Sequence, residues 1–230
     1  MFHVKHTDCF SIEEFKKLLK NYLDIELSLE SQERFSLYLN ELSSWNKKIN
    51  LISRKKDKPE DIYRHFLDSL LIFKALQIPQ SSKIMDLGSG AGFPAIPMKI
   101  LREDLDITLV ESIRKKTLFL KKMIELLGLK DITVFQERIE KLPELQGFKE
   151  SFDFVTAKAF GKVKDTINNS YPFLKQGGIL VAYKGSSYKT EIIELLEGFE
   201  NLKLQIKDIK FFEIPEIDLR RFFVLIEKIS

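Results

Sequence analysis

The chain has 230 residues, of which 44% are hydrophobic, and a formal net charge of +3; this suits one domain with an additional region, or two small domains. Its single cysteine, Cys9, excludes a disulfide framework and a cysteine-based zinc site, and it favours a reducing, cytoplasmic location. The apolar runs are far too short to cross a bilayer and there is no apolar core of signal-peptide length, so no membrane partner is expected.

The first third of the chain has helical patterns. A capping box at Ser11–Glu14 begins the first helix, and Pro59 stands where the first turn of another helix tolerates proline. Apolar residues at helical spacing predict three helices, at about residues 12–23, 29–48 and 59–76. A turn-rich link follows at Ile78–Ser82. We therefore divide the chain into an N-terminal helical region, residues 1–80, and a second domain, residues 81–230.

Strand and helix patterns alternate after this link. The strands are expected at Ile84–Leu87, Ile107–Val110, Ile132–Phe135, Phe152–Ala157 and Ile179–Lys184. The helices are expected at Pro94–Arg102, Ile113–Leu127, Val163–Phe173 and Lys189–Gly198, with a short turn near Glu137–Leu142. This series predicts a mainly parallel sheet covered on both faces. Two final strands, Leu202–Phe212 and Arg221–Lys228, are separated only by a loop and should pair antiparallel.

The stretch Lys83–Pro97 reads KIMDLGSGAGFPAIP, which predicts a strand, a glycine-rich turn and a helix. Its glycines occupy every second position: Gly88, Gly90 and Gly92. Dinucleotide-binding folds instead use G-x-G-x-x-G. Asp86 lies inside the motif, and Glu111 ends the next strand, where a carboxylate can accept both ribose hydroxyls of an adenosine. The combination resembles motif I of S-adenosylmethionine-dependent methyltransferases and the acidic position that follows it. With the terminal hairpin, it predicts an α/β fold: the seven-stranded, Rossmann-like class I methyltransferase sheet with an N-terminal helical extension.

Basic residues are distributed in clusters. On the helix expected at Ile113–Leu127, four cations fall within one arc opposite an apolar face. Such an arc can be a solvated helix face, but clusters elsewhere favour a surface that contacts phosphates. The candidate RNA contacts are Arg54, Lys55, Arg114, Lys115, Lys121, Lys122, Lys184, Arg220 and Arg221.

Two polar residues, His65 and Asp68, are one turn apart on the third helix and can face the same way. By themselves they favour a surface ion pair over an active-site role. No metal site is expected, because the chain has only three histidines and two of them, His3 and His6, are in the first ten residues.

The atom that receives a methyl group can be argued partly by exclusion. Ala157–Phe160 follows the fourth strand and lacks the Asn/Asp-Pro-Pro-aromatic loop that is common in enzymes acting on exocyclic amines. A cysteine nucleophile for pyrimidine C5 is disfavoured, because Cys9 lies near the start of the chain. Guanine N7 has a free lone pair, so transfer there needs alignment and exclusion of water but no general base.

Residues 12–228 resemble the RsmG (GidB) family, bacterial guanine-N7 methyltransferases of small-subunit ribosomal RNA. The matching stretches are WNKKINL at Trp45–Leu51, RHFLDS at Arg64–Ser69, DLGSGAGFPAIP at Asp86–Pro97, VES at Val110–Ser112 with RKK at Arg114–Lys116, RIE at Arg138–Glu140, and YKG at Tyr183–Gly185.

The resemblance implies S-adenosyl-L-methionine as donor, S-adenosyl-L-homocysteine as product and 16S ribosomal RNA of the small subunit as partner. The candidate donor contacts are Asp86, Gly88, Gly90, Gly92, Phe93, Glu111, Ile139, Glu140 and Lys158. Lys158 replaces a family arginine, which keeps the charge but loses the planar fork. The resemblance also implies His65, Asp68 and Lys158 as catalytic candidates, with Ser69 beside them.

Other functions stay open at this point. The chain could be an RNA-binding assembly factor of the small subunit that keeps the fold with weak catalysis, which the lysine at position 158 favours. A small-molecule methyltransferase is disfavoured by the basic clusters, and a nicotinamide-dependent dehydrogenase by the glycine spacing and the terminal hairpin. A monomeric, cytoplasmic enzyme is the expectation.

Overall fold

The computed structural model describes residues 11–53, 58–185 and 203–229. Several expectations lie outside these ranges: the surroundings of Cys9, the cations Arg54 and Lys55, and the helix expected at Lys189–Gly198.

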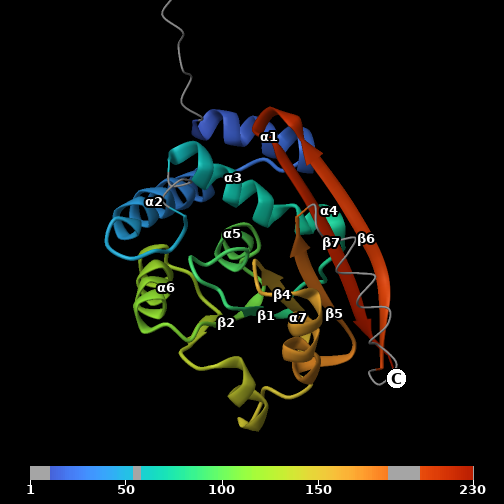
Figure 1. The fold of residues 1–230 in the computed structure, drawn as a ribbon. Coiled ribbons are helices and arrows are strands. Elements are labelled where there is room, and N and C mark those ends of the chain that lie inside the picture. The colour runs from blue at the N-terminus through green and yellow to red at the C-terminus, as the bar shows by residue number, and fades with distance from the viewer. Residues whose placement is uncertain (1–10, 54–57, 186–202, 230) are drawn as a thin grey trace, which may run out of the picture.

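The described residues form one sheet of seven strands in the order β3-β2-β1-β4-β5-β7-β6. The strands are β1 (Lys83–Leu87), β2 (Asp106–Val110), β3 (Ile132–Phe135), β4 (Phe152–Lys158), β5 (Leu174–Lys184), β6 (Leu204–Ile214) and β7 (Leu219–Lys228). The first five pair in parallel, and β7 runs antiparallel to both β5 and β6 (Figure 1). The predicted α/β class and the terminal hairpin are therefore confirmed.

The helices agree closely with the expected ranges. They are α1 (Ile12–Leu23), α2 (Leu29–Asn46), α3 (Pro59–Leu70), α4 (Ile72–Ala75), α5 (Ala95–Leu101), α6 (Arg114–Leu126) and α7 (Val163–Ser170), with short 3₁₀ turns η2 (Ile139–Glu144), η3 (Tyr171–Phe173) and η5 (Pro215–Ile217). The capping box of α1 is formed in both directions between Ser11 and Glu14. The single helix expected over 59–76 is instead divided at Leu71, where the amide of Lys74 bonds the Leu71 carbonyl three residues back.

β5 begins before the strand expected at Ile179–Lys184 and runs through the glycine pair Gly177 and Gly178. Gly177 has a φ of +76°, and a Cβ at Gly178 would lie 2.9 Å from the carbonyl oxygen of Lys175 and 3.0 Å from that of Phe152. The register between β4 and β5 shifts at this point. Glycine is needed here because the bulged strand passes close to its neighbour's backbone.

Side chains of each strand alternate between two apolar clusters, one on each face of the sheet. Ile84 of β1 joins the cluster under α1–α6, and Met85 joins the cluster beside η2 and α7. The first cluster combines Phe15, Phe35 and Phe66 of the N-terminal helices with residues of β1 and β2. The helical region and the sheet thus share one core, and the division at residue 80 stays a proposal about chain organisation.

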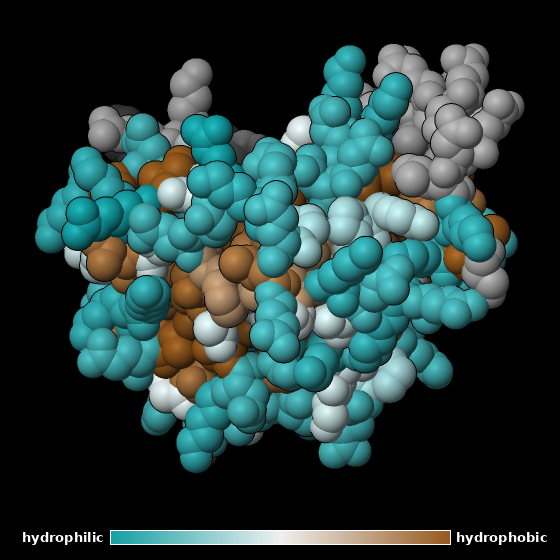
Figure 2. Space-filling model, turned by 90° about the horizontal axis from the view of Figure 1, so that it is seen from below, coloured by the Kyte–Doolittle hydropathy of each residue, from teal (hydrophilic) through white to brown (hydrophobic). Residues whose placement is uncertain are grey.

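Most of the face seen from below is hydrophilic, and its largest hydrophobic area lies left of the centre, among hydrophilic side chains (Figure 2). Among the described residues, no helix combines the length and apolar character needed to span a membrane. In the same part of the chain, no group of three histidine, cysteine or acidic residues is placed to hold a metal ion.

Candidate functional site

The three glycines of the motif all adopt left-handed backbone conformations after β1 ends at Leu87. Their φ angles are +66° at Gly88, +55° at Gly90 and +92° at Gly92. A Cβ at Gly92 would lie 2.5 Å from a side-chain carbon of Ile96, whereas a Cβ at Gly90 would meet nothing nearer than the Gly88 carbonyl at 3.7 Å. Gly92 is therefore required by packing, while Gly90 is required by backbone shape and leaves open space beside the loop.

Glu111, at the end of β2, holds this loop from one side. One carboxylate oxygen accepts the backbone N–H of Gly90 at 3.0 Å, and the other accepts the N–H of Ile113 at 2.8 Å. The side chain is buried. Each carboxylate oxygen has two acceptor sites, so both can take a further donor.

Asp86 is fully buried below the same loop. Its Oδ1 accepts the hydroxyl of Thr156 at 2.7 Å, but its Oδ2 has no hydrogen-bond partner among the described residues. Burial raises the pKa of Asp86 to about 7, although the Thr156 and Ser89 hydroxyls favour the charged form. A buried carboxylate oxygen without a partner is costly, which makes it a natural acceptor for a bound cation or N–H donor.

A pocket of about 310 Å³ opens at the carboxyl ends of β1 and β2, the usual ligand position in a sheet of this kind. It is lined by Gly88, Glu111, Ser112, Ile139, Glu140 and Phe160, among others. A larger groove of about 840 Å³, lined by Phe73 and Leu101, lies at the opposite end of α5 from the glycine loop. The smaller pocket is the candidate site, because four of the expected donor contacts line it: Gly88, Glu111, Ile139 and Glu140.

A buried ion cluster lies beside the pocket and joins three distant parts of the chain. Asp68 of α3 accepts two parallel hydrogen bonds from Arg221 of β7, at 2.6 and 2.7 Å, and the ammonium of Lys158 lies 2.9 Å from the same carboxylate. The two cations hold the pKa of Asp68 at about 2 against the effect of burial. Burial lowers the pKa of Lys158, and Asp68 opposes that shift.

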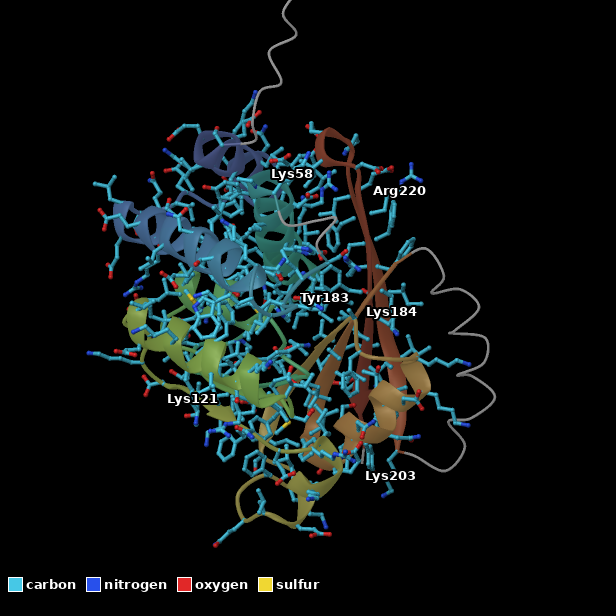
Figure 3. The ribbon with its side chains drawn as sticks, turned by 60° about the vertical axis from the view of Figure 1, so that its left-hand side comes forward. Lys58, Lys121, Tyr183, Lys184, Lys203 and Arg220 are labelled. Carbon is cyan, nitrogen blue, oxygen red and sulfur yellow. The ribbon has the colours of Figure 1, made fainter. Side chains whose placement is uncertain are left out.

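This cluster is connected to the glycine loop through Phe93. The ring of His65 stacks on Phe93 with centroids 5.2 Å apart, and the Lys158 ammonium lies 5.0 Å from the Phe93 centroid. Tyr183 of β5 is buried, its hydroxyl donates to the Ser69 carbonyl at 3.0 Å, and Figure 3 labels it near the middle of the molecule. The expected catalytic candidates are thus adjacent to one another and to the glycine loop.

Two expected RNA contacts are engaged elsewhere, and these expectations need correction. Lys184 is buried and donates to the Gly161 carbonyl at 2.9 Å. Arg221 uses its guanidinium fork on Asp68. In contrast, Arg114, Lys115, Lys121 and Arg220 are exposed and Lys122 is half-exposed.

Sequence reasoning missed two residues of the site, Thr156 and Phe160. Thr156 faces Asp86 from the neighbouring strand, and only the β1–β4 pairing reveals that contact. Phe160 follows β4 by two residues, in the stretch that lacks the Asn/Asp-Pro-Pro-aromatic loop, and no sequence pattern assigns its ring a role.

Comparison with known proteins decides the family. A family model described as rRNA small subunit methyltransferase G, GidB, matches residues 31–219. The chain belongs to this family.

Relatives in the GidB family match almost the whole chain. Ribosomal RNA small subunit methyltransferase G of Desulfitobacterium hafniense is 36% identical over 214 residues, which cover 93% of this chain and 88% of that protein. The protein of the same name from Clostridium botulinum strain Loch Maree is 36% identical over 210 residues, covering 91% and 87%. The chain is therefore a methyltransferase of the GidB family.

Solved structures agree on the fold. TYW2 of M. jannaschii, solved in complex with AdoMet, superposes with a TM-score of 0.59 at 14% identity, covering 80% of each chain. A predicted O-methyltransferase from Agrobacterium tumefaciens gives 0.56 at 21% identity, covering 72% of this chain and 80% of that one. At these identities the likeness supports the class I methyltransferase fold alone.

Proposed function

We propose that the enzyme transfers a methyl group from S-adenosylmethionine to N7 of a guanine in 16S ribosomal RNA. The donor assignment rests on the cradle that Gly90, Glu111 and Asp86 form around the glycine loop. Gly90 leaves open space beside the loop, Glu111 offers two carboxylate oxygens as acceptors, and Asp86 has a carboxylate oxygen without a partner in the described part of the chain. The bound donor supplies a methyl group on a positively charged sulfur.

The residues of the cradle fit such a donor. Glu111 would accept the ribose hydroxyls, and Ile139 and Glu140 of η2 would line the adenine end of the pocket. Asp86 would face the donor's ammonium group through Oδ2. Lys158, beside Phe93, would bind the donor carboxylate as a point charge.

The ion cluster explains how lysine can serve where the family has arginine. The planar, bidentate contact to Asp68 comes from Arg221, so Lys158 is required only as a charge. Asp68 and Arg221 are then positioning residues for Lys158, and His65 fixes the ring of Phe93. None of these groups has to accept a proton, which suits transfer to the lone pair of guanine N7.

Substitution of Glu111 tests the ribose assignment. Glu111→Ala should weaken binding of both S-adenosylmethionine and S-adenosylhomocysteine by about tenfold to a hundredfold, because charge-assisted hydrogen bonds are lost. Isothermal titration calorimetry measures both constants. The control is Glu125→Ala, an exposed carboxylate on α6. Selective loss for only one of the two ligands contradicts a ribose role.

Asp86 predicts a pH dependence of donor binding. With a pKa of about 7 in the free protein, Asp86 is increasingly protonated as the pH falls below 7, whereas the donor ammonium favours the carboxylate. Donor affinity should therefore fall by up to tenfold per pH unit between pH 7 and 6. Asp86→Asn should lower the affinity at pH 8 and flatten the profile. A wild-type profile that is flat over this range contradicts the contact.

The exposed arc on α6 is proposed to contact RNA phosphates. Figure 3 places Lys121 far from Arg220, so the basic residues on the two sides of the molecule do not form one cluster. Substituting Arg114 and Lys121 by Ala should reduce the slope of log K against log salt by about one unit per lost contact, with donor affinity unchanged.

A matched control removes two charges elsewhere. Lys83 and Lys175 lie at the amino ends of β1 and β5, away from the site, and their side chains are 56% and 43% exposed. Their double alanine variant should keep the salt slope. If the α6 variant also keeps it, this arc is only a solvated helix face.

We propose that the enzyme works in the cytoplasm, on a small ribosomal subunit, and that it acts as a monomer. The test combines two steps: calorimetric binding of S-adenosylmethionine, then methyl transfer to undermethylated small subunits and, separately, to naked 16S RNA. Donor binding with transfer supports the enzyme, and binding without transfer to either RNA contradicts it and favours an assembly factor.

A further inference from the structure

The ring of Phe160 lies against the first glycine of the loop. Its Cδ2 is 2.9 Å, and its Cε2 3.3 Å, from the position that a Cβ at Gly88 would occupy. Phe160 also lines the candidate donor pocket together with Glu111, and it is the one aromatic side chain among the described residues that do so. The ring is only partly buried, so a ligand that crosses Gly88 meets it.

The loop that carries this ring is held from two sides. The buried hydroxyl of Thr166 donates to the Phe160 carbonyl at 2.7 Å, and the buried ammonium of Lys184 donates to the Gly161 carbonyl at 2.9 Å. The residues on either side, Ala159 and Gly161, both have left-handed φ angles of +56° and +51°. A non-glycine residue in this region costs energy and persists only where its surroundings fix it.

The pocket around the ring is rich in negative charge. Its described lining residues include three glutamates and one cation, Arg138. The glutamates are Glu111, Glu137 and Glu140. The face of an aromatic ring attracts a cation electrostatically, most strongly where water is excluded. The donor carries a sulfonium, whereas the product S-adenosylhomocysteine has a neutral thioether at the same atom.

We propose that Phe160 distinguishes donor from product through a cation–π contact with the sulfonium. The inference rests on the donor site proposed above. Its consequence is that the ring adds to the affinity for the charged donor only, and that this contact is lost once the methyl group has been transferred. Product release is favoured for that reason.

Calorimetric titration with each ligand tests the proposal without any RNA. Phe160→Leu keeps an apolar side chain but removes the ring, so affinity for S-adenosylmethionine should fall by about threefold to tenfold. Affinity for S-adenosylhomocysteine should change by less than about twofold. Phe160→Tyr should keep the wild-type ratio, and Phe211→Leu, on the exposed face of β6, is the control.

A second series protects the test against misfolding of the leucine variant. Fluorinated phenylalanines at position 160 keep the shape of the ring and weaken its negative face, so donor affinity should fall stepwise while product affinity stays constant. Equal changes for both ligands, or no change for either, contradict the proposal while the donor site stands. A wild-type chain that binds neither ligand contradicts the donor site and this inference together.

Discussion

Asp68→Ala should destabilise the protein by about 3–5 kcal/mol, because it leaves the cations of Lys158 and Arg221, whose side chains are only 9% and 20% exposed, without their shared anion. Lys158 and Arg221 both contact the Asp68 carboxylate, which is 2% exposed. A buried charge that loses its partner has neither water nor a counterion to stabilise it. Urea unfolding monitored by circular dichroism measures the change.

The control for this variant is Glu213→Ala. Glu213 accepts from Arg220 at 2.7 Å with the same chemistry, but on the exposed end of the hairpin. Its removal should cost less than about 1 kcal/mol. The double variant Asp68→Ala with Arg221→Ala should lose less unfolding free energy than the two single variants lose in sum. The reason is that the double variant no longer contains the unpaired Arg221 cation. Additive losses would mean that the cluster is not coupled.

The same carboxylate predicts a response to acid. The folded-state pKa of Asp68, about 2, lies below its ordinary value of 3.8, so the ionised form stabilises the fold. This contribution is fully present above the unfolded pKa and is lost as the pH falls from about 4 toward 2. Asp68→Asn should make the free energy of unfolding less dependent on pH within that window.

Gly90→Val should abolish donor binding. A Cβ at Gly90 would point into the open space beside the loop, where the donor is proposed to lie, and a branched side chain there would occupy it. The left-handed φ of +55° adds backbone strain of about 1–3 kcal/mol, so some loss of stability is also expected. Calorimetry at a temperature where the variant is folded measures the binding.

Gly128→Val separates strain from ligand contact. Gly128 has a φ of +61° in the turn after α6, and a Cβ there would meet nothing within 4 Å. This variant should lose similar stability and keep full donor affinity. Normal donor binding by Gly90→Val would show that the loop has been wrongly assigned as the donor cradle.

Local signals in the sequence were enough to predict most of the fold. The capping box at Ser11–Glu14 and the proline at position 59 act over one helical turn, and both mark true helix starts. The glycine motif likewise reports on backbone angles at its own positions. Each of these features depends only on residues that are close along the chain.

The site depends on contacts that sequence spacing cannot show. Asp68 and Arg221 are 153 residues apart, and they meet because β7 inserts next to β5. Lys184 resembles a surface cation in the sequence, but the residue is buried and its ammonium donates to the Gly161 carbonyl. Which cations are free for RNA is therefore decided by the packing of the sheet.

The most direct test of the central claim maps N7-methylguanosine in ribosomal RNA from cells with and without this gene. We expect that one N7-methylguanosine in 16S RNA disappears when the gene is deleted, returns with the wild-type gene, and does not return with Gly90→Val. An unchanged 16S modification pattern in the deletion strain would contradict the account, as would loss of a methyl group from another atom or another RNA.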